Sequence, residues 1–290
     1  MNALPIRAAR ETLLAHGIVP DRCEILQNSS TLVLRLTHSL VARVVQDTDG
    51  PRQGTEWFAR ENAVAHHLTT HGAPVIPLHP DLPPGPHEHL GYPMNFWKFV
   101  TATGASPVAE QIGETLGRCH GILRRFTEPL PKLAILRESL GVVATLGHRN
   151  LVPAETLRLL EKHLEAALEA LEPAPSQPLH GDAHLGNLLD TTEGLLWTDW
   201  EDTFSGPPEW DVASVLWNAR FLEQDGATVE GILEGYRRAG GSLENTLLEH
   251  CFAARAAVIC AWYPVLYPNP DGDRRAKLAH RLEWLRGRPL

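Results

Sequence analysis

The chain has 290 residues, of which 43% are hydrophobic and 21% are charged, as is ordinary for a soluble globular protein. Its net charge of −9 argues against binding a phosphate backbone as the main task, so no nucleic-acid partner is expected. No apolar run is long enough to cross a bilayer, and the N-terminus lacks a signal pattern. We therefore expect no membrane partner and a cytoplasmic location.

The first hundred residues predict a small antiparallel sheet with one main helix. Residues 5–16 have helical spacing and end at Gly17. The β-rich runs that follow, separated by turn residues, lie at 23–27, 31–36 and 40–45. A helix is then predicted over 56–70, and residues 94–100 form an apolar run that predicts a buried strand.

Two charged residues are predicted to meet between the strand and the helix. The period of two places Arg43 on the same strand face as Val41 and Val45. Glu61 lies within the apolar stripe of helix 56–70. A charge on each of two inward faces is costly unless the two charges pair. We therefore predict an Arg43–Glu61 ion pair.

The rest of the chain is predicted to be mostly helical. Ser106 and Pro107 have the residue types of an N-cap and a first helical turn, so a helix is expected to begin there. Further helices are expected over 153–171, 211–221, 228–238, from 242 onward, and over 273–285. A Pro-rich segment separates helix 153–171 from a loop at residue 180.

The stretch from His180 to Asp211 carries the chemistry. Its sequence is HGDAHLGNLLDTTEGLLWTDWEDTFSGPPEWD. Turn residues between two apolar runs predict a hairpin that brings Asn187 and Asp199 together, where two oxygen ligands can share one hard cation. Asp182 would lie close to whatever that cation holds. A carboxylate beside an Asp/Asn-held Mg²⁺ is what phosphoryl transfer requires.

These motifs resemble the aminoglycoside phosphotransferase and choline kinase superfamily, the small-molecule branch of the protein-kinase-like fold. The resemblance rests on H-G-D-x-x-x-x-N, the following Asp strand and G-P-P-E-W-D. It implies a bilobal α+β fold, with a β-rich nucleotide-binding lobe over residues 1–100. A helical catalytic and substrate-binding lobe is implied over residues 101–290.

The resemblance also implies roles for residues of the catalytic stretch. Asp182 would be the catalytic base, Asn187 and Asp199 the magnesium ligands, and Asp211 a buried brace for the loop. His180 is expected to have a structural role, with its imidazole fixing the backbone of this loop.

In the first lobe, the resemblance implies that Arg43 holds the nucleotide phosphates and that Glu61 orients Arg43. Arg stands where this fold usually has Lys. The residues implied to contact the nucleotide elsewhere are Ser29 and Ser30 through the backbone of a turn, Phe99 beside the base, and Val100 and Ala102 through the backbone of the hinge.

The function implied is transfer of the γ-phosphate of ATP or GTP, with Mg²⁺, to a hydroxyl of a small molecule. Residues 101–290 carry 18 basic and 26 acidic side chains, and Glu201, Asp202 and Glu209 would favour a cationic acceptor if they faced its cleft. An ordinary solvated turn explains these three residues equally well.

Two alternatives remain open from the sequence. A non-catalytic nucleotide-binding pseudokinase is supported mainly by Arg43 in place of Lys. A metallohydrolase would use His180, Asp182 and His184 as ligands of zinc or iron, but this alternative leaves the hairpin and Asp199 unexplained.

Overall fold

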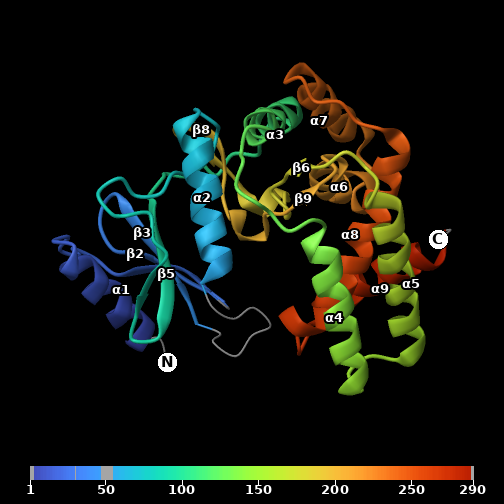
Figure 1. The fold of residues 1–290 in the computed structure, drawn as a ribbon, viewed down its shortest axis with the longest axis horizontal. Helices are drawn as coiled ribbons and strands as arrows, with labels where there is room; N and C mark the ends of the chain where they lie inside the picture. The colour runs from blue at the N-terminus through green and yellow to red at the C-terminus, as the bar shows by residue number, and fades with distance from the viewer. Residues whose placement is uncertain (1–2, 30, 47–54, 289–290) are drawn as a thin grey trace.

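The computed structural model describes residues 3–29, 31–46 and 55–288. A five-stranded antiparallel sheet with two helices lies at one end of the molecule, and the remaining helices lie at the other (Figure 1). The sheet has the order β1-β2-β3-β5-β4. Its strands are β1 (Glu24–Asn28), β2 (Thr31–Arg35), β3 (Leu40–Val45), β4 (His87–His89) and β5 (Tyr92–Lys98).

A helix covers each face of the sheet. Leu40, Ala42 and Val44 of β3 pack into an apolar cluster with α1 (Ala3–Ala15). The alternate residues of β3 face α2 (Glu56–Thr70), where Val45 packs against Trp57 and Phe58. The strand alternation therefore directs Arg43 toward α2.

Seven helices follow the sheet in the described part of the chain. They are α3 (Ala109–Leu123), α4 (Ala134–His148), α5 (Ala154–Leu171), α6 (Glu209–Trp217), α7 (Gly226–Arg238), α8 (Asn245–Leu266) and α9 (Gly272–Arg286), with a π-helix at Asn218–Leu222 after α6. Helix α5 packs against α4, α8 and α9 (Figure 1). No helix of the described residues is long and apolar enough to cross a membrane.

Two details differ from the sequence prediction. The helix expected from Ser106 begins instead at Ala109, and its first hydrogen bond runs from Ile112 N–H to Val108 C=O. Val108 is the N-cap residue, with extended backbone and no side-chain cap. Helix α4 was not predicted at all.

Helices α3 and α7 lie side by side because glycines allow their backbones to meet (Figure 1). A Cβ added at Gly113 of α3 would lie 1.8 Å from Ile232 O. A Cβ added at Gly235 of α7 would lie 1.8 Å from Glu110 O. These two contacts fix α7 against α3.

The predicted hairpin is present between the sheet and the helices. Strands β7 (Leu188–Thr191) and β8 (Gly194–Trp197) pair in antiparallel register, and Thr198 N–H donates to Asn187 O. Backbone bonds also join the hairpin to the segment after β5, since Thr103 N–H donates to Asp190 O. The hairpin therefore has a fixed position relative to the sheet.

Candidate active site

The loop that carries Asp182 is held from beneath by Asp211. This carboxylate is fully buried and accepts hydrogen bonds from His180 N–H at 2.7 Å, Gly181 N–H at 3.0 Å and His120 Nε2 at 3.0 Å. Bonds from several donors to one buried carboxylate both satisfy its charge and fix the backbone that donates them. Asp211 has the contacts expected of a brace.

His180 also uses both of its ring nitrogens within the protein. Nε2 lies 2.9 Å from Thr198 O, and Nδ1 accepts from Asp182 N–H at 3.3 Å. The ring is buried against Trp200. Both nitrogens are therefore engaged in fixing the loop, as expected of a structural histidine.

Gly181 is required by the geometry of this loop. Its φ is +88°, and an added Cβ would lie 2.0 Å from Asp202 O. Trp210 Nε1 donates to Gly181 O at 2.7 Å. The backbone on the N-terminal side of Asp182 is thereby held by close contact as well as by hydrogen bonds.

Asp182 points into a cleft and has a cationic partner. Arg255 Nη2 of α8 lies 2.6 Å from Asp182 Oδ1, and His184 Nε2 lies 3.4 Å from Oδ2. Burial alone would raise the pKa of Asp182, but the Arg255 guanidinium and the His184 hydrogen bond outweigh it and hold that pKa below its ordinary value. Asp182 is therefore a carboxylate at neutral pH.

Asn187 and Asp199 lie at the two ends of the hairpin, which are joined by the hydrogen bond from Thr198 N–H to Asn187 O. Asn187 Nδ2 donates to Asp182 O at 3.0 Å, so its amide oxygen remains to coordinate a cation. Asp199 lies 3.1 Å from Arg43 through Oδ1, which is buried and accepts no hydrogen bond from the described residues. An oxygen pair of this kind fits a Mg²⁺ ion that takes its other ligands from water and phosphate.

Arg43 is surrounded by three carboxylates. Its Nη1 lies 3.2 Å from Glu61 Oε1, which confirms the predicted ion pair. Nη2 is paired with Asp199 and with Glu201. Asn95, directly across from Arg43 in the sheet, donates to Glu61 Oε2 at 3.1 Å.

Three ionised carboxylates would carry more negative charge than Arg43 balances, and the pKa values of Glu61 and Glu201 respond to this. Burial raises the pKa of Glu61 to about 7, although Arg43 opposes this. Burial also raises the pKa of Glu201 to about 8, with Asp199 adding to the effect. A divalent cation beside Asp199 would offset this excess charge.

The structure supports the predicted nucleotide contacts near the hinge only in part. The face of Phe99 is covered by the Arg35 guanidinium, 3.5 Å from the ring centroid, and Phe99 N–H donates to Ser39 O. In the described chain, no backbone hydrogen bond engages the N–H groups of Val100 and Ala102. Their contact with a nucleotide base stays a prediction.

The turn between β1 and β2 gives a partial result. Ser29 lines the cleft, but its N–H donates to Thr31 O at 3.0 Å and is not available to phosphate in this conformation. Ser30 lies outside the described residues.

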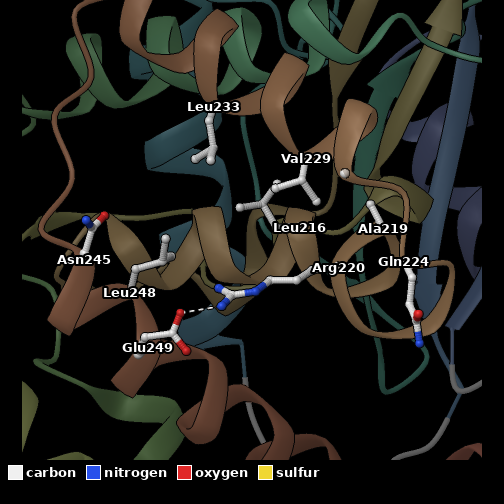
Figure 2. A pocket seen from close by; sticks show the side chains of 10 residues that line it. Leu216, Ala219, Arg220, Gln224, Val229, Leu233, Asn245, Leu248 and Glu249 are labelled. Carbon is white, nitrogen blue, oxygen red and sulfur yellow. Dashed lines mark hydrogen bonds and ion pairs between the residues drawn. The ribbon is translucent and has the colours of Figure 1, made fainter.

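A cavity of about 1050 Å³ joins the sheet side to the helical side. Asp182, Asp199 and Glu201 line it, together with one face of α8 and one face of α9. A second pocket, of about 630 Å³, lies between α6, α7 and α8 and contains the Arg220–Glu249 ion pair (Figure 2). None of the predicted catalytic residues lines that second pocket.

Sequence reasoning missed two contacts, Arg255 with Asp182 and Glu201 with Arg43. Arg255 is buried between Ala254 and Ala256, in the stretch 251–266 of α8 whose other residues are all apolar. The argument that paired Arg43 with Glu61 applies to it, because a buried charge requires a partner. The separation of Arg255 and Asp182 along the chain does not identify Asp182 as that partner.

Two of the three acidic residues expected at an acceptor cleft are bound to other residues of the protein. Glu209 is buried, and its Oε1 accepts from Glu244 N–H at 2.7 Å. Glu201 lines the cavity but is bound to Arg43. Asp202 also lines the cavity, so of the three residues only Glu209 lies outside the cleft.

The metallohydrolase alternative has no support in the geometry. Within the described ranges, no group of three or more His, Cys, Asp or Glu side chains is arranged to hold a metal ion. His180 has no nitrogen left for coordination.

Comparison with protein families matches residues 11–245 to the Phosphotransferase enzyme family. The chain belongs to this family. Membership confirms the predicted class of enzyme, a phosphotransferase. A search of curated proteins found no match.

Solved structures share the fold of this phosphotransferase at low sequence identity. An amicoumacin kinase, hAmiN, in complex with AMP-PNP and Ca²⁺ has a TM-score of 0.75 at 14% identity, covering 96% of this chain and 93% of that one. Spectinomycin phosphotransferase APH(9)-Ia with ADP and spectinomycin has a TM-score of 0.65 at 14% identity, covering 98% and 96%. A choline/ethanolamine kinase family protein from Mesorhizobium loti has a TM-score of 0.62 at 20% identity, covering 97% and 94%. The predicted protein-kinase-like α+β fold is thereby confirmed.

Proposed function

We propose that this phosphotransferase moves the γ-phosphate of ATP or GTP to a hydroxyl of a small molecule, with Asp182 as the base. The observation that carries the proposal is that the ionised Asp182 and Asp199 line one cavity, with Asn187 bonded to the backbone of Asp182 and the Arg43–Glu61 pair next to Asp199. Phosphoryl transfer needs mainly positioning and charge stabilisation, and this set supplies both.

Each side chain has a separate task in the proposed mechanism. Asp182 accepts a hydrogen bond from the acceptor hydroxyl, orients its oxygen and takes its proton as that oxygen bonds the γ-phosphorus and ADP or GDP leaves. Mg²⁺ held by Asn187 and Asp199 would neutralise charge on the phosphates. Arg43 binds a phosphate oxygen, while Glu61 fixes the direction of the Arg43 guanidinium.

We also propose that residues 1–100 act as the nucleotide lobe and residues 101–290 as the catalytic and acceptor lobe. The predicted boundary falls just after β5 ends at Lys98, and the cavity lies between the two parts. Phe99, Val100 and Ala102 are retained as the hinge contacts of the base, and Ser29 and Ser30 as the phosphate turn. A cytoplasmic location remains part of this proposal.

The proposal is tested by incubating the enzyme with Mg-ATP or Mg-GTP and a panel of anionic, neutral and cationic hydroxyl compounds. ADP or GDP formation and the ³¹P NMR spectrum of the products are recorded. We expect a phosphomonoester that forms only when both an acceptor and Mg²⁺ are present. Nucleotide hydrolysis without any phosphorylated acceptor, or full turnover in EDTA, would contradict the proposal.

A further inference from the structure

The acceptor side of the cavity is basic. Helix α9 presents Arg274, Lys277 and Arg281 to the cavity, spaced three and four residues apart and so on one face. Helix α8 adds Arg255. No Asp or Glu of α8 or α9 is among the described residues that line the cavity.

Arg274 and Lys277, the two exposed cations of α9, already have carboxylate partners. Arg274 pairs with Asp271 at 3.1 Å, and Lys277 pairs with Asp273 at 2.8 Å. Both pairs are well exposed, so they contribute little net field within the cavity. The charge of Lys277 and Arg274 is therefore largely balanced at the rim.

Arg281 lies deeper and is not balanced. Within the described part of the chain, no carboxylate lies within ion-pair distance of it, and its Nε is buried without a hydrogen-bond partner. Its surroundings include Cys260, Tyr263 and Arg255. Burial lowers the pKa of Arg281, and the positive charge of Arg255 adds to this.

Arg255 connects this cation to the catalytic residue. Its side chain is 8% exposed and bonded to Asp182, yet its Nε is also buried without a partner. The charge of Arg255 is therefore paired with Asp182, whereas the neighbouring Arg281 has no ion-pair partner among the described residues. Arg281 is half-buried, and a cation partly removed from water gains stability when a ligand supplies a counter-charge.

The same wall offers apolar contact surface. Trp262 and Tyr263 of α8 line the cavity together with Trp217 and Tyr267. Flat aromatic side chains provide large contact area for a ring or other apolar body. The wall thus combines an apolar surface with an uncompensated guanidinium near the proposed base.

We propose that the acceptor is an anionic hydroxyl compound whose carboxylate or phosphate binds Arg281 while its hydroxyl reaches Asp182. This deepens the proposed function and rests on it. The charge of the acceptor is then opposite to the one that Glu201, Asp202 and Glu209 would favour if they faced the cleft.

The test uses 4-(hydroxymethyl)benzoate, its neutral amide, and the cationic 4-(aminomethyl)benzyl alcohol as matched probes, with inorganic phosphate as a fourth. Binding is measured by calorimetry on the full chain, with and without saturating Mg-AMP-PNP. We expect the benzoate to bind at least about tenfold more tightly than the amide and the cation, as one charge-assisted hydrogen bond implies. Inorganic phosphate distinguishes a phosphate preference from a carboxylate preference.

Variants of α9 assign the effect to one side chain. Arg281→Gln should weaken benzoate binding by about tenfold or more and leave amide binding unchanged, and Arg281→Lys should restore part of the affinity. Arg286→Gln is the matched control, because Arg286 is on the same helix, pairs with Glu283 and does not line the cavity.

Three results would overturn the proposal. The first is equal affinity for benzoate and amide, and the second is benzoate binding unchanged in Arg281→Gln. The third is loss of Arg281-dependent anion binding when Mg-AMP-PNP is present, which would assign Arg281 to the nucleotide phosphates. Failure of Mg-AMP-PNP to bind at all would instead contradict the proposed function, so the two failures are distinguishable.

Discussion

Two sets of contacts hold Asp182, one on the backbone before it and one on its carboxylate. The backbone before it is fixed by Asp211 and Trp210, and the carboxylate itself is fixed by Arg255. Because these contacts come from α6 and α8, the position of the proposed base depends on how the helices pack.

Replacing Gly181 by Ala should damage this loop. The new Cβ would lie 2.0 Å from Asp202 O at a φ of +88°. Overpacking and left-handed backbone together should lower the free energy of unfolding by about 3 kcal/mol. Displacement of Asp182 should lower kcat by about a hundredfold.

Gly194→Ala is the control for the strain that a positive φ alone imposes on alanine. Gly194 also has a positive φ, of +102°, but no atom lies within 4 Å of an added Cβ. Urea unfolding of both variants separates backbone strain from the contact with Asp202. Equal losses of stability would show that the close contact at Gly181 has no effect.

Arg255 should control the pH dependence of activity. Burial raises the pKa of Asp182, and Arg255 more than reverses this, so the ionised form persists as pH falls below the ordinary value of 3.8. In Arg255→Gln the effect of burial remains, so the acid limb of kcat/KM should move upward toward neutral pH. Arg255→Lys should keep the acid limb low.

The pH profile of kcat/KM checks this directly. An acid limb at the same pH in wild type and Arg255→Gln would contradict the assignment of Asp182 as the titrating base. Thermal unfolding of each variant over the same pH range excludes acid denaturation as the cause.

At the scale of elements, the close pairing of α3 and α7 supports the loop indirectly. His120 of α3 bridges Tyr236 of α7 and the brace Asp211, at 2.8 Å and 3.0 Å. The glycine contacts between the helices therefore set the position of a residue that bonds to Asp211.

Gly235→Ala should force these helices apart. Its Cβ would lie 1.8 Å from Glu110 O, and a backbone carbonyl cannot move away without shifting α3. We expect a loss of about 1–3 kcal/mol in the free energy of unfolding. The matched control is Gly141→Ala in α4, where the space is open and stability should rise by about 0.5–1 kcal/mol.

Urea unfolding measures both changes. A Gly235→Ala protein as stable as wild type would show that the close helix contact does not constrain the fold. Activity of Gly235→Ala, measured below its melting temperature, would then show whether α7 affects the brace through His120.

At the scale of the whole molecule, the sequence predicted the features that follow from the periodicity of one strand or helix or from one turn. Arg43 and Glu61 were paired from two periodicities, and the hairpin between Asn187 and Asp199 was predicted from its turn residues. These inferences succeed because neighbouring elements pack in few ways.

Contacts between distant elements were not predictable in this way. Arg255 is 73 residues from Asp182, and Glu201 is 158 residues from Arg43. Periodicity shows that a side chain is buried but not which residue it meets. The basic face of α9 was missed because Arg274, Lys277 and Arg281 lie in a strongly polar helix that looks solvated.

The central claim is that Asp182 acts as the base in phosphoryl transfer, and its most direct test is the rate of ADP formation by Asp182→Asn. This substitution keeps the shape of the side chain and removes its charge. Asp190→Asn, on the neighbouring hairpin strand and outside the residues that line the cavity, is the control. We predict that Asp182→Asn lowers kcat by about 10²–10⁴, the range of a positioned base, while Asp190→Asn stays close to wild type. A wild-type kcat in Asp182→Asn would contradict the account.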